Sequence, residues 1–189
     1  MKRIIAISLC MVFVLCLCGC GGGKNKEKDG IDIEYYANLG QIPENDVVLG
    51  TTYEELIAVL DKRGAEAEKN GEDYGYNEFD GENNVLIAEG PYDYYYKKAD
   101  PKKEIGYMIA YGTAFGFEKD EVILNVENAL KKFDYTKESA NEQNAFFYFG
   151  DYSKAEVLKV NFEKTTVIFL FEESVLTATA IYRTIFGNN

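Results

Sequence analysis

The sequence contains no histidine among its 189 residues. Histidine is the usual general base near neutral pH, a common partner of catalytic nucleophiles and a frequent zinc ligand. Beyond residue 20 the serines are Ser139, Ser153 and Ser174, and none lies in a Gly-x-Ser-x-Gly or Ser-x-x-Lys motif. The sequence therefore predicts a protein that is not an enzyme, with no catalytic residues and no cofactor.

Basic residues are also scarce, with 20 lysines and arginines against 32 aspartates and glutamates and a net charge of −12. Such an acidic surface repels the phosphate groups of nucleic acids. We therefore expect no nucleic-acid partner.

Cysteine occurs only near the start of the chain. Lys2 and Arg3 precede the apolar stretch Ile4 to Leu17, which is too short to span a hydrocarbon core of about 30 Å comfortably. A positively charged start followed by a short apolar region is typical of an export signal. We therefore interpret residues 1–19 as a signal peptide rather than as part of the fold.

The signal ends in Leu17-Cys18-Gly19-Cys20, which resembles the lipobox of bacterial lipoproteins. The resemblance implies a diacylglyceryl group on Cys20, fatty acids such as palmitate, and a mature chain that starts at this residue. It also implies a lipid anchor in the membrane, on the extracytoplasmic face of the cell envelope. An ordinary secretory signal and an uncleaved anchor are the alternatives.

Cleavage before Cys20 leaves a mature chain with one cysteine and therefore no internal disulfide. Its 18 basic and 32 acidic residues give a net charge of −14. Residues 20–30 show no apolar periodicity and are typical of a flexible tether. The remaining 31–189 are expected to form a single domain, of a size that is stable from its apolar core alone.

An apolar-Gly pair, an acidic pair and an aliphatic pair occur in Leu49 to Ile57 and recur 66 residues later, in Phe115 to Ile123. Each phrase leads into an amphipathic helix pattern. Thr52 and Glu55 match a capping box, and Gly64 is the expected end of the first helix. The second helix is expected from Val122 to Phe133.

Runs rich in β-forming residues follow each helix. The predicted strands are Val85 to Glu89, Tyr92 to Lys97 and Ile105 to Tyr111, then Phe146 to Phe149, Val157 to Phe162, Thr166 to Phe171 and Val175 to Tyr182. The predicted fold class is therefore α+β, with two tandem helix-plus-antiparallel-strand units at about 47–113 and 114–184. The helices would pack on one face of an antiparallel sheet and leave the other face free.

Tandem units of this kind, with a Gly-x-Thr-x-x-Glu helix start, are similar to the β-lactamase inhibitor protein and to small envelope lipoproteins with related units. The resemblance covers about residues 47 to 183. It implies a binding scaffold that presents a concave sheet to another protein.

The predicted binding surface is rich in tyrosine. Alternation along a strand places Tyr92, Tyr94 and Tyr96 on one face, and three phenols in a row are expensive to bury. Tyr107 and Tyr111 lie together on one face of the next strand, and we add them to the surface. The alternative is that these tyrosines only cover the sheet, with their hydroxyls in water.

Two charged segments are weaker candidates. Four lysines flank Asp100-Pro101, namely Lys97, Lys98, Lys102 and Lys103. We interpret this segment as a solvated hairpin turn, with an electrostatic binding site for an acidic partner or lipid headgroups as the alternative. The acidic segment 72–82 is read as a soluble loop, because its spacing does not match an EF-hand, and we predict no metal site. A hydrolase using Asp73, Glu78 and Asp80 is the remaining enzyme hypothesis.

The sequence thus predicts a membrane-anchored extracytoplasmic lipoprotein with a non-catalytic protein-binding domain. Its partners would be the membrane, through the lipid on Cys20, and an envelope protein of unknown identity. A receptor for a small ligand or a cell-wall glycan, with the tyrosines as stacking platforms, is the alternative.

Overall fold

The computed structural model describes residues 31–184 except 113, 119, 146, 148 and 149. Its helices are α2 (Ile33–Leu39), α3 (Tyr53–Asn70) and α4 (Ile123–Leu130), with a short 3₁₀ turn at Tyr152–Lys154. The strands are β1 (Tyr76–Asp80), β2 (Asn84–Glu89), β3 (Tyr92–Lys97), β4 (Ile105–Tyr111), β5 (Tyr135–Ser139), β6 (Ala155–Asn161), β7 (Thr165–Glu172) and β8 (Val175–Arg183).

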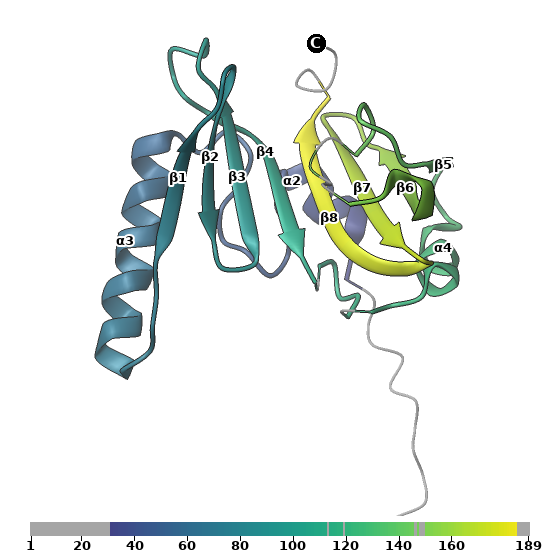
Figure 1. Cartoon of the computed structure of the whole chain (residues 1–189), viewed down its shortest axis with the longest axis horizontal. Coiled ribbons are helices and arrows are strands. Elements are labelled where there is room, and N and C mark those ends of the chain that lie inside the picture. Colours follow the sequence, from purple (N-terminus) through teal and green to yellow (C-terminus); the bar gives the residue numbers. More distant parts are fainter. Residues whose placement is uncertain (1–30, 113, 119, 146, 148–149, 185–189) are drawn as a thin grey trace, which may run out of the picture. The chain divides into compact units, whose positions relative to one another are not determined.

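These eight strands form one antiparallel sheet in the order β1-β2-β3-β4-β8-β7-β6-β5 (Figure 1). The helix α3 precedes β1–β4 in the chain, and α4 precedes β5–β8. β4 pairs with β8, so the last strand of each group meets at the centre of the sheet. The described part of the chain is therefore a mixed α and β fold that consists mostly of sheet.

The helix α3 begins as the sequence predicts. Thr52 is its N-cap and forms a capping box with Glu55. The predicted end at Gly64 is wrong, because the helix continues to Asn70 and ends at Gly71, whose φ of 72° is left-handed. A Cβ on Gly64 would lie 3.1 Å from the ring of Tyr74, so this glycine makes room for an aromatic ring rather than ending the helix.

All three helices pack into one apolar cluster with the sheet. Leu56 and Leu60 of α3 are fully buried there, as are Val126 and Leu130 of α4. The short helix α2, which the sequence analysis missed, contributes Ala37. We call this side of the sheet the helix face.

The opposite side of the sheet is covered over its second half. Ala140, Ala145 and Phe147, in the connection between β5 and β6, join a second apolar cluster with β4, β6, β7 and β8. The ring centroid of Phe147 lies 6.0 Å from that of Tyr107. The expectation of a completely free second face is therefore wrong, because residues of this connection cover β4 as well as β6–β8.

Each longer helix starts with the same pair of backbone hydrogen bonds. The amide of Tyr53 donates to the carbonyl of Lys103, and that of Ile123 donates to Ser174. Likewise, the amide of Ile105 donates to Thr51 and that of Leu176 donates to Glu121. Tyr53 and Ile123 are 70 residues apart, so the helix starts correspond at this spacing and not at the predicted 66.

Two edge strands were missed by the sequence analysis. β1 lies within the acidic segment predicted to be a loop, and β5 precedes the predicted strand Phe146 to Phe149. Phe147 lies in a turn, and the other three positions lie outside the described residues. Both missed strands expose four of their five residues, so they lack the apolar alternation by which strands are recognised.

Candidate binding surface

The three tyrosines of β3 do share a face, but it is the helix face. Tyr94 is 0% exposed and Tyr96 is 5% exposed, while Tyr92 is half-buried against the same cluster. The prediction that they form an accessible row is therefore wrong. Of the other two predicted tyrosines, Tyr107 is fully buried on the opposite face, and only Tyr111 is exposed, at 37%.

Two phenols of β3, those of Tyr94 and Tyr92, have hydrogen-bond partners. Asn45 Nδ2 donates to the Tyr94 hydroxyl at 2.8 Å, and that hydroxyl donates to Glu89 Oε2 at 2.8 Å. The Tyr92 hydroxyl donates to the backbone carbonyl of Glu44. Satisfied polar groups of this kind can be buried without a large loss of stability.

Glu89 is the centre of a polar network under α3. Its side chain accepts from Arg63 Nη1 at 2.5 Å and from the Tyr74 hydroxyl at 2.6 Å, in addition to Tyr94. Arg63 Nη2 also donates to the side chains of Asn45 and Asp46. Burial and the contact with Glu89 raise the pKa of Tyr74. This network joins α3, the β2–β3 hairpin and the segment before α3.

The other side of β1–β4 presents a different set of residues, which we call the open face. Residues opposite each other in antiparallel strands point to the same side, and the register pairs Phe79 with Leu86 and Leu86 with Tyr95. Phe79 is 53% exposed, and Leu86 and Tyr95 are half-buried. The open face consists of Asn77, Phe79, Asn84, Leu86, Ala88, Asp93, Tyr95, Lys97 and Tyr111. Tyr107 and Ile109 of β4 lie on the same side but are fully buried.

Asp93 is the acidic residue of the open face, and Lys97 lies four residues further along the same side of β3. The Tyr111 hydroxyl donates to Asp93 Oδ2 at 2.9 Å, and the Tyr95 hydroxyl interacts electrostatically with this carboxylate. Partial burial raises the pKa of Asp93, although both phenols oppose that effect. Burial and the nearby carboxylate raise the pKa of Tyr95 and of Tyr111. A partly desolvated carboxylate thus accepts a hydrogen bond from Tyr111 and interacts with a second phenol, Tyr95.

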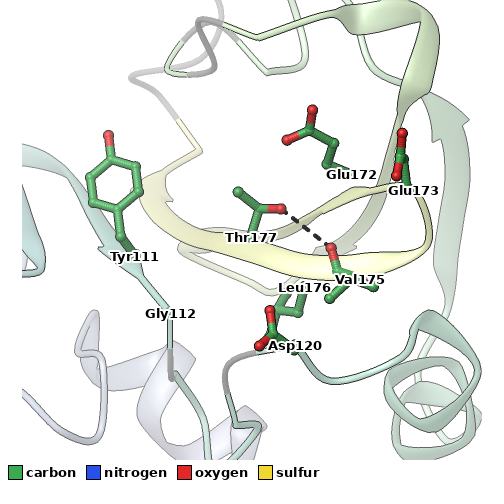
Figure 2. Close-up of a pocket in the computed structure, with 8 residues that line it drawn as sticks. All are labelled: Tyr111, Gly112, Asp120, Glu172, Glu173, Val175, Leu176 and Thr177. Atoms are coloured by element: carbon green, nitrogen blue, oxygen red, sulfur yellow. Dashed lines mark hydrogen bonds between the residues drawn. The ribbon is translucent and has the colours of Figure 1, made fainter.

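A cleft of about 730 Å³ begins at Tyr111. Figure 2 shows the ring of Tyr111 on one side and three carboxylates, those of Asp120, Glu172 and Glu173, around the start of β8. The cleft is lined by Tyr111, Gly112, Asp120, Glu172, Glu173, Val175, Leu176 and Thr177. The open face therefore ends in an acidic depression.

The lysine-rich segment forms the turn between β3 and β4. Asp100 accepts from the amides of Lys102 at 3.0 Å and Glu104 at 2.8 Å, and these bonds lower its pKa. Lys98 pairs with Asp80, and Lys103 lies over the ring of Tyr53. These contacts are the ones expected of a solvated hairpin turn.

The acidic segment 72–82 contributes β1 and side-chain contacts to α3. Glu78 accepts from the Tyr53 hydroxyl at 2.8 Å, which raises the pKa of Tyr53 to about 12. Asp73 is exposed in the connection before β1. Within the described ranges, no group of three or more acidic or cysteine side chains could hold a metal ion.

Cys20, the predicted lipidation site, lies outside the described residues, as do the signal 1–19 and the tether 20–30. In the part of the chain from residue 31 to 184 that the structure describes, no helix has the length and apolar character needed to cross a membrane. No family model, curated protein or solved structure shows a significant match to this chain.

Proposed function

We propose that this protein is a lipoprotein of the cell envelope, anchored in the membrane by a lipid on Cys20, that binds another protein without catalysis. The lipobox-like ending of residues 1–19 supports the anchor and the extracytoplasmic location. The tether 20–30 would keep the folded domain close to the membrane surface.

We further propose that residues 47–184 arose as two related units, each a helix followed by four antiparallel strands. The matching backbone hydrogen bonds at the starts of α3 and α4 support this proposal. Matching residues with left-handed backbone conformation also support it. Gly50 and Asp120 have positive φ before α3 and α4, and Lys103 and Ser174 have positive φ before β4 and β8.

The open face is the observation that supports protein binding. Phe79 is more than half exposed, and Leu86 and Tyr95 continue its apolar surface across β2 and β3. Contiguous exposed apolar side chains on a soluble domain mark sites of interaction. Aromatic residues such as Tyr95 and Tyr111 supply rigid contact area at protein interfaces.

Site-specific photo-crosslinking in intact cells tests this proposal. A photoreactive phenylalanine analogue at Phe79 or Leu86 is expected to give a discrete adduct of higher mass. The same analogue at Lys62, whose side chain is exposed on α3, is the control and should not give that adduct. Equal adduct patterns from all three positions, or no adduct from the open face, would rule out this binding surface.

Membrane fractionation tests the anchor separately. The wild-type chain is expected to carry a lipid-sized mass increment and to remain with the membranes. Cys20→Ala should lose both properties. Release of both proteins without modification would contradict the lipid anchor but would leave the open face to be tested by crosslinking.

A receptor for a small ligand or a glycan is the second candidate. The cleft beside Tyr111 has a volume within the range of small-molecule sites, about 300–1,000 Å³, which favours this reading. A glycan array separates the two proposals, since retention of a defined glycan that is lost on Tyr111→Ala would favour the receptor.

A further inference from the structure

The β2–β3 hairpin carries two partly or fully buried carboxylates on opposite faces. Glu89 ends β2 and is 5% exposed on the helix face. Asp93, near the start of β3, is half-buried on the open face, opposite Ala88 in the register. Glu89 accepts hydrogen bonds from the phenols of Tyr74 and Tyr94, and Asp93 accepts one from Tyr111 and interacts electrostatically with Tyr95.

Glu89 is paired with a cation, whereas Asp93 is not paired with one among the described residues. Glu89 pairs with the Arg63 guanidinium at 2.5 Å. None of the ion pairs between described residues involves Asp93. A carboxylate that is partly removed from water is stabilised by a paired cation, as Glu89 is.

The surroundings of Asp93 favour a cation. Tyr111 joins the open face to the acidic cleft, where Glu172 and Asp120 add negative charge. Phenol rings attract cations through their faces, and the hydroxyls of Tyr95 and Tyr111 both interact with the carboxylate. The neighbouring Leu86 and Phe79 are apolar and suit an aliphatic or aromatic side chain of the same partner.

We propose that Asp93, with Tyr95 and Tyr111, is the anchor point for an arginine or lysine side chain of the partner protein. This cation would occupy a position equivalent to that of Arg63 beside Glu89. The partner segment would combine this cation with apolar residues that contact Leu86 and Phe79. This inference rests on the proposed protein-binding function and specifies the chemistry of the partner.

The test uses a fluorescein-labelled hexapeptide that alternates phenylalanine and arginine, together with the same peptide carrying neutral citrulline for arginine. Fluorescence anisotropy with the full chain measures both dissociation constants. The wild type is expected to bind the arginine peptide at least about tenfold more tightly, as expected for a partly desolvated charge pair. Asp93→Asn should reduce this preference to less than about twofold.

The matched control is Asp73→Asn, which removes the same charge from an exposed position of the acidic segment. It should keep the preference of the wild type for arginine. Equal binding of the two peptides by the wild type would overturn the proposal, as would an equal loss in Asp73→Asn and Asp93→Asn, because the effect would then come from net charge alone. A discrete crosslinked adduct from Phe79, obtained alongside either result, would leave the protein-binding function standing.

Discussion

The two halves of the sheet, β1–β4 and β5–β8, have the same strand order on either side of the β4–β8 pair but differ in how their faces are covered. In the second half, α4 covers one face and the β5–β6 connection covers the other. In the first half, the open face retains exposed aromatic side chains. The β5–β6 connection thus covers the second half and the adjoining strand β4, whereas the accessible side chains lie mainly on β1–β3.

The halves also differ beneath their helices. In the second half, Phe169 is fully buried and its ring contacts those of Phe115 and Phe117. In the first half, the polar network around Glu89 and Arg63 joins the apolar residues. We therefore expect the halves to respond differently to substitution.

The largest difference should come from paired phenylalanine substitutions. Phe169→Ala removes a fully buried ring and should lower the free energy of unfolding by about 3–5 kcal/mol, because it leaves a cavity. Phe79→Ala, at a position that is 53% exposed, should change it by less than about 1 kcal/mol. Urea denaturation measures both, and equal losses would contradict the assignment of an open face.

Removal of the central carboxylate of the network should have the next largest effect. Glu89→Gln removes the buried charged partner of the Arg63 guanidinium, which then keeps only its ion pair with the more exposed Asp46. We expect a loss of about 2–3 kcal/mol, below the value for a fully buried pair because the Arg63 side chain is 24% exposed. Lys62→Gln, which breaks an exposed pair on the same helix, should change stability by less than about 0.5 kcal/mol. If Glu89→Gln lowered the free energy of unfolding by no more than Lys62→Gln does, the network would not be needed for stability.

The helix starts give a smaller contrast. Thr52 caps α3 through its side chain, whereas Val122 at the start of α4 makes no side-chain cap. Thr52→Ala should therefore destabilise by about 1 kcal/mol, and Val122→Ala by clearly less. The capping bonds lower the pKa of Glu55, so its contribution is present above the ordinary value of 4.5 and is lost as pH falls through the folded-state pKa. Thermal melts across this pH range should show the Thr52→Ala difference shrinking in acid.

The smallest effects should have opposite signs at Asp93 and Asp100. Burial raises the pKa of Asp93, so its ionised form opposes folding at neutral pH and this penalty disappears as pH falls below its ordinary range. Backbone hydrogen bonds lower the pKa of Asp100, so its contribution is favourable above its ordinary range and is lost in acid.

At pH 7, Asp93→Asn should therefore raise the melting temperature slightly, and Asp100→Asn should lower it. Both differences should diminish at pH 3. A destabilised Asp93→Asn at pH 7 would show that the carboxylate serves the fold, as a structural role predicts, rather than a partner.

The sequence predicted correctly those features that depend on neighbouring residues. The capping box of Thr52 and Glu55 is local, so the start of α3 could be located from four positions. Alternation along a strand likewise placed Tyr92, Tyr94 and Tyr96 on one side of β3. The end of α3 could not be predicted in this way, because the reason for Gly64 is the ring of Tyr74, ten residues later.

The sequence did not predict which side of β3 the helices cover. Alternation is symmetrical, so it does not tell which set of side chains meets the helices. Burial of Tyr94 depends on Asn45 and on Glu89, whose contact with Arg63 requires the packed helix α3. The accessible residues of β3 are therefore Asp93 and Tyr95 rather than the predicted Tyr94 and Tyr96. Of the predicted surface, Tyr111 remains accessible.

The sequence by itself thus determined the absence of histidine chemistry, the acidic charge, the helix start at Thr52 and the shared side of alternate residues. These follow from composition and from interactions within a few residues. Only the tertiary structure decided which face is open, because that choice depends on where α3, α4 and the β5–β6 connection pack. Their contacts join residues far apart in the chain. The removal of apolar surface from water stabilises these contacts only when all of them form together.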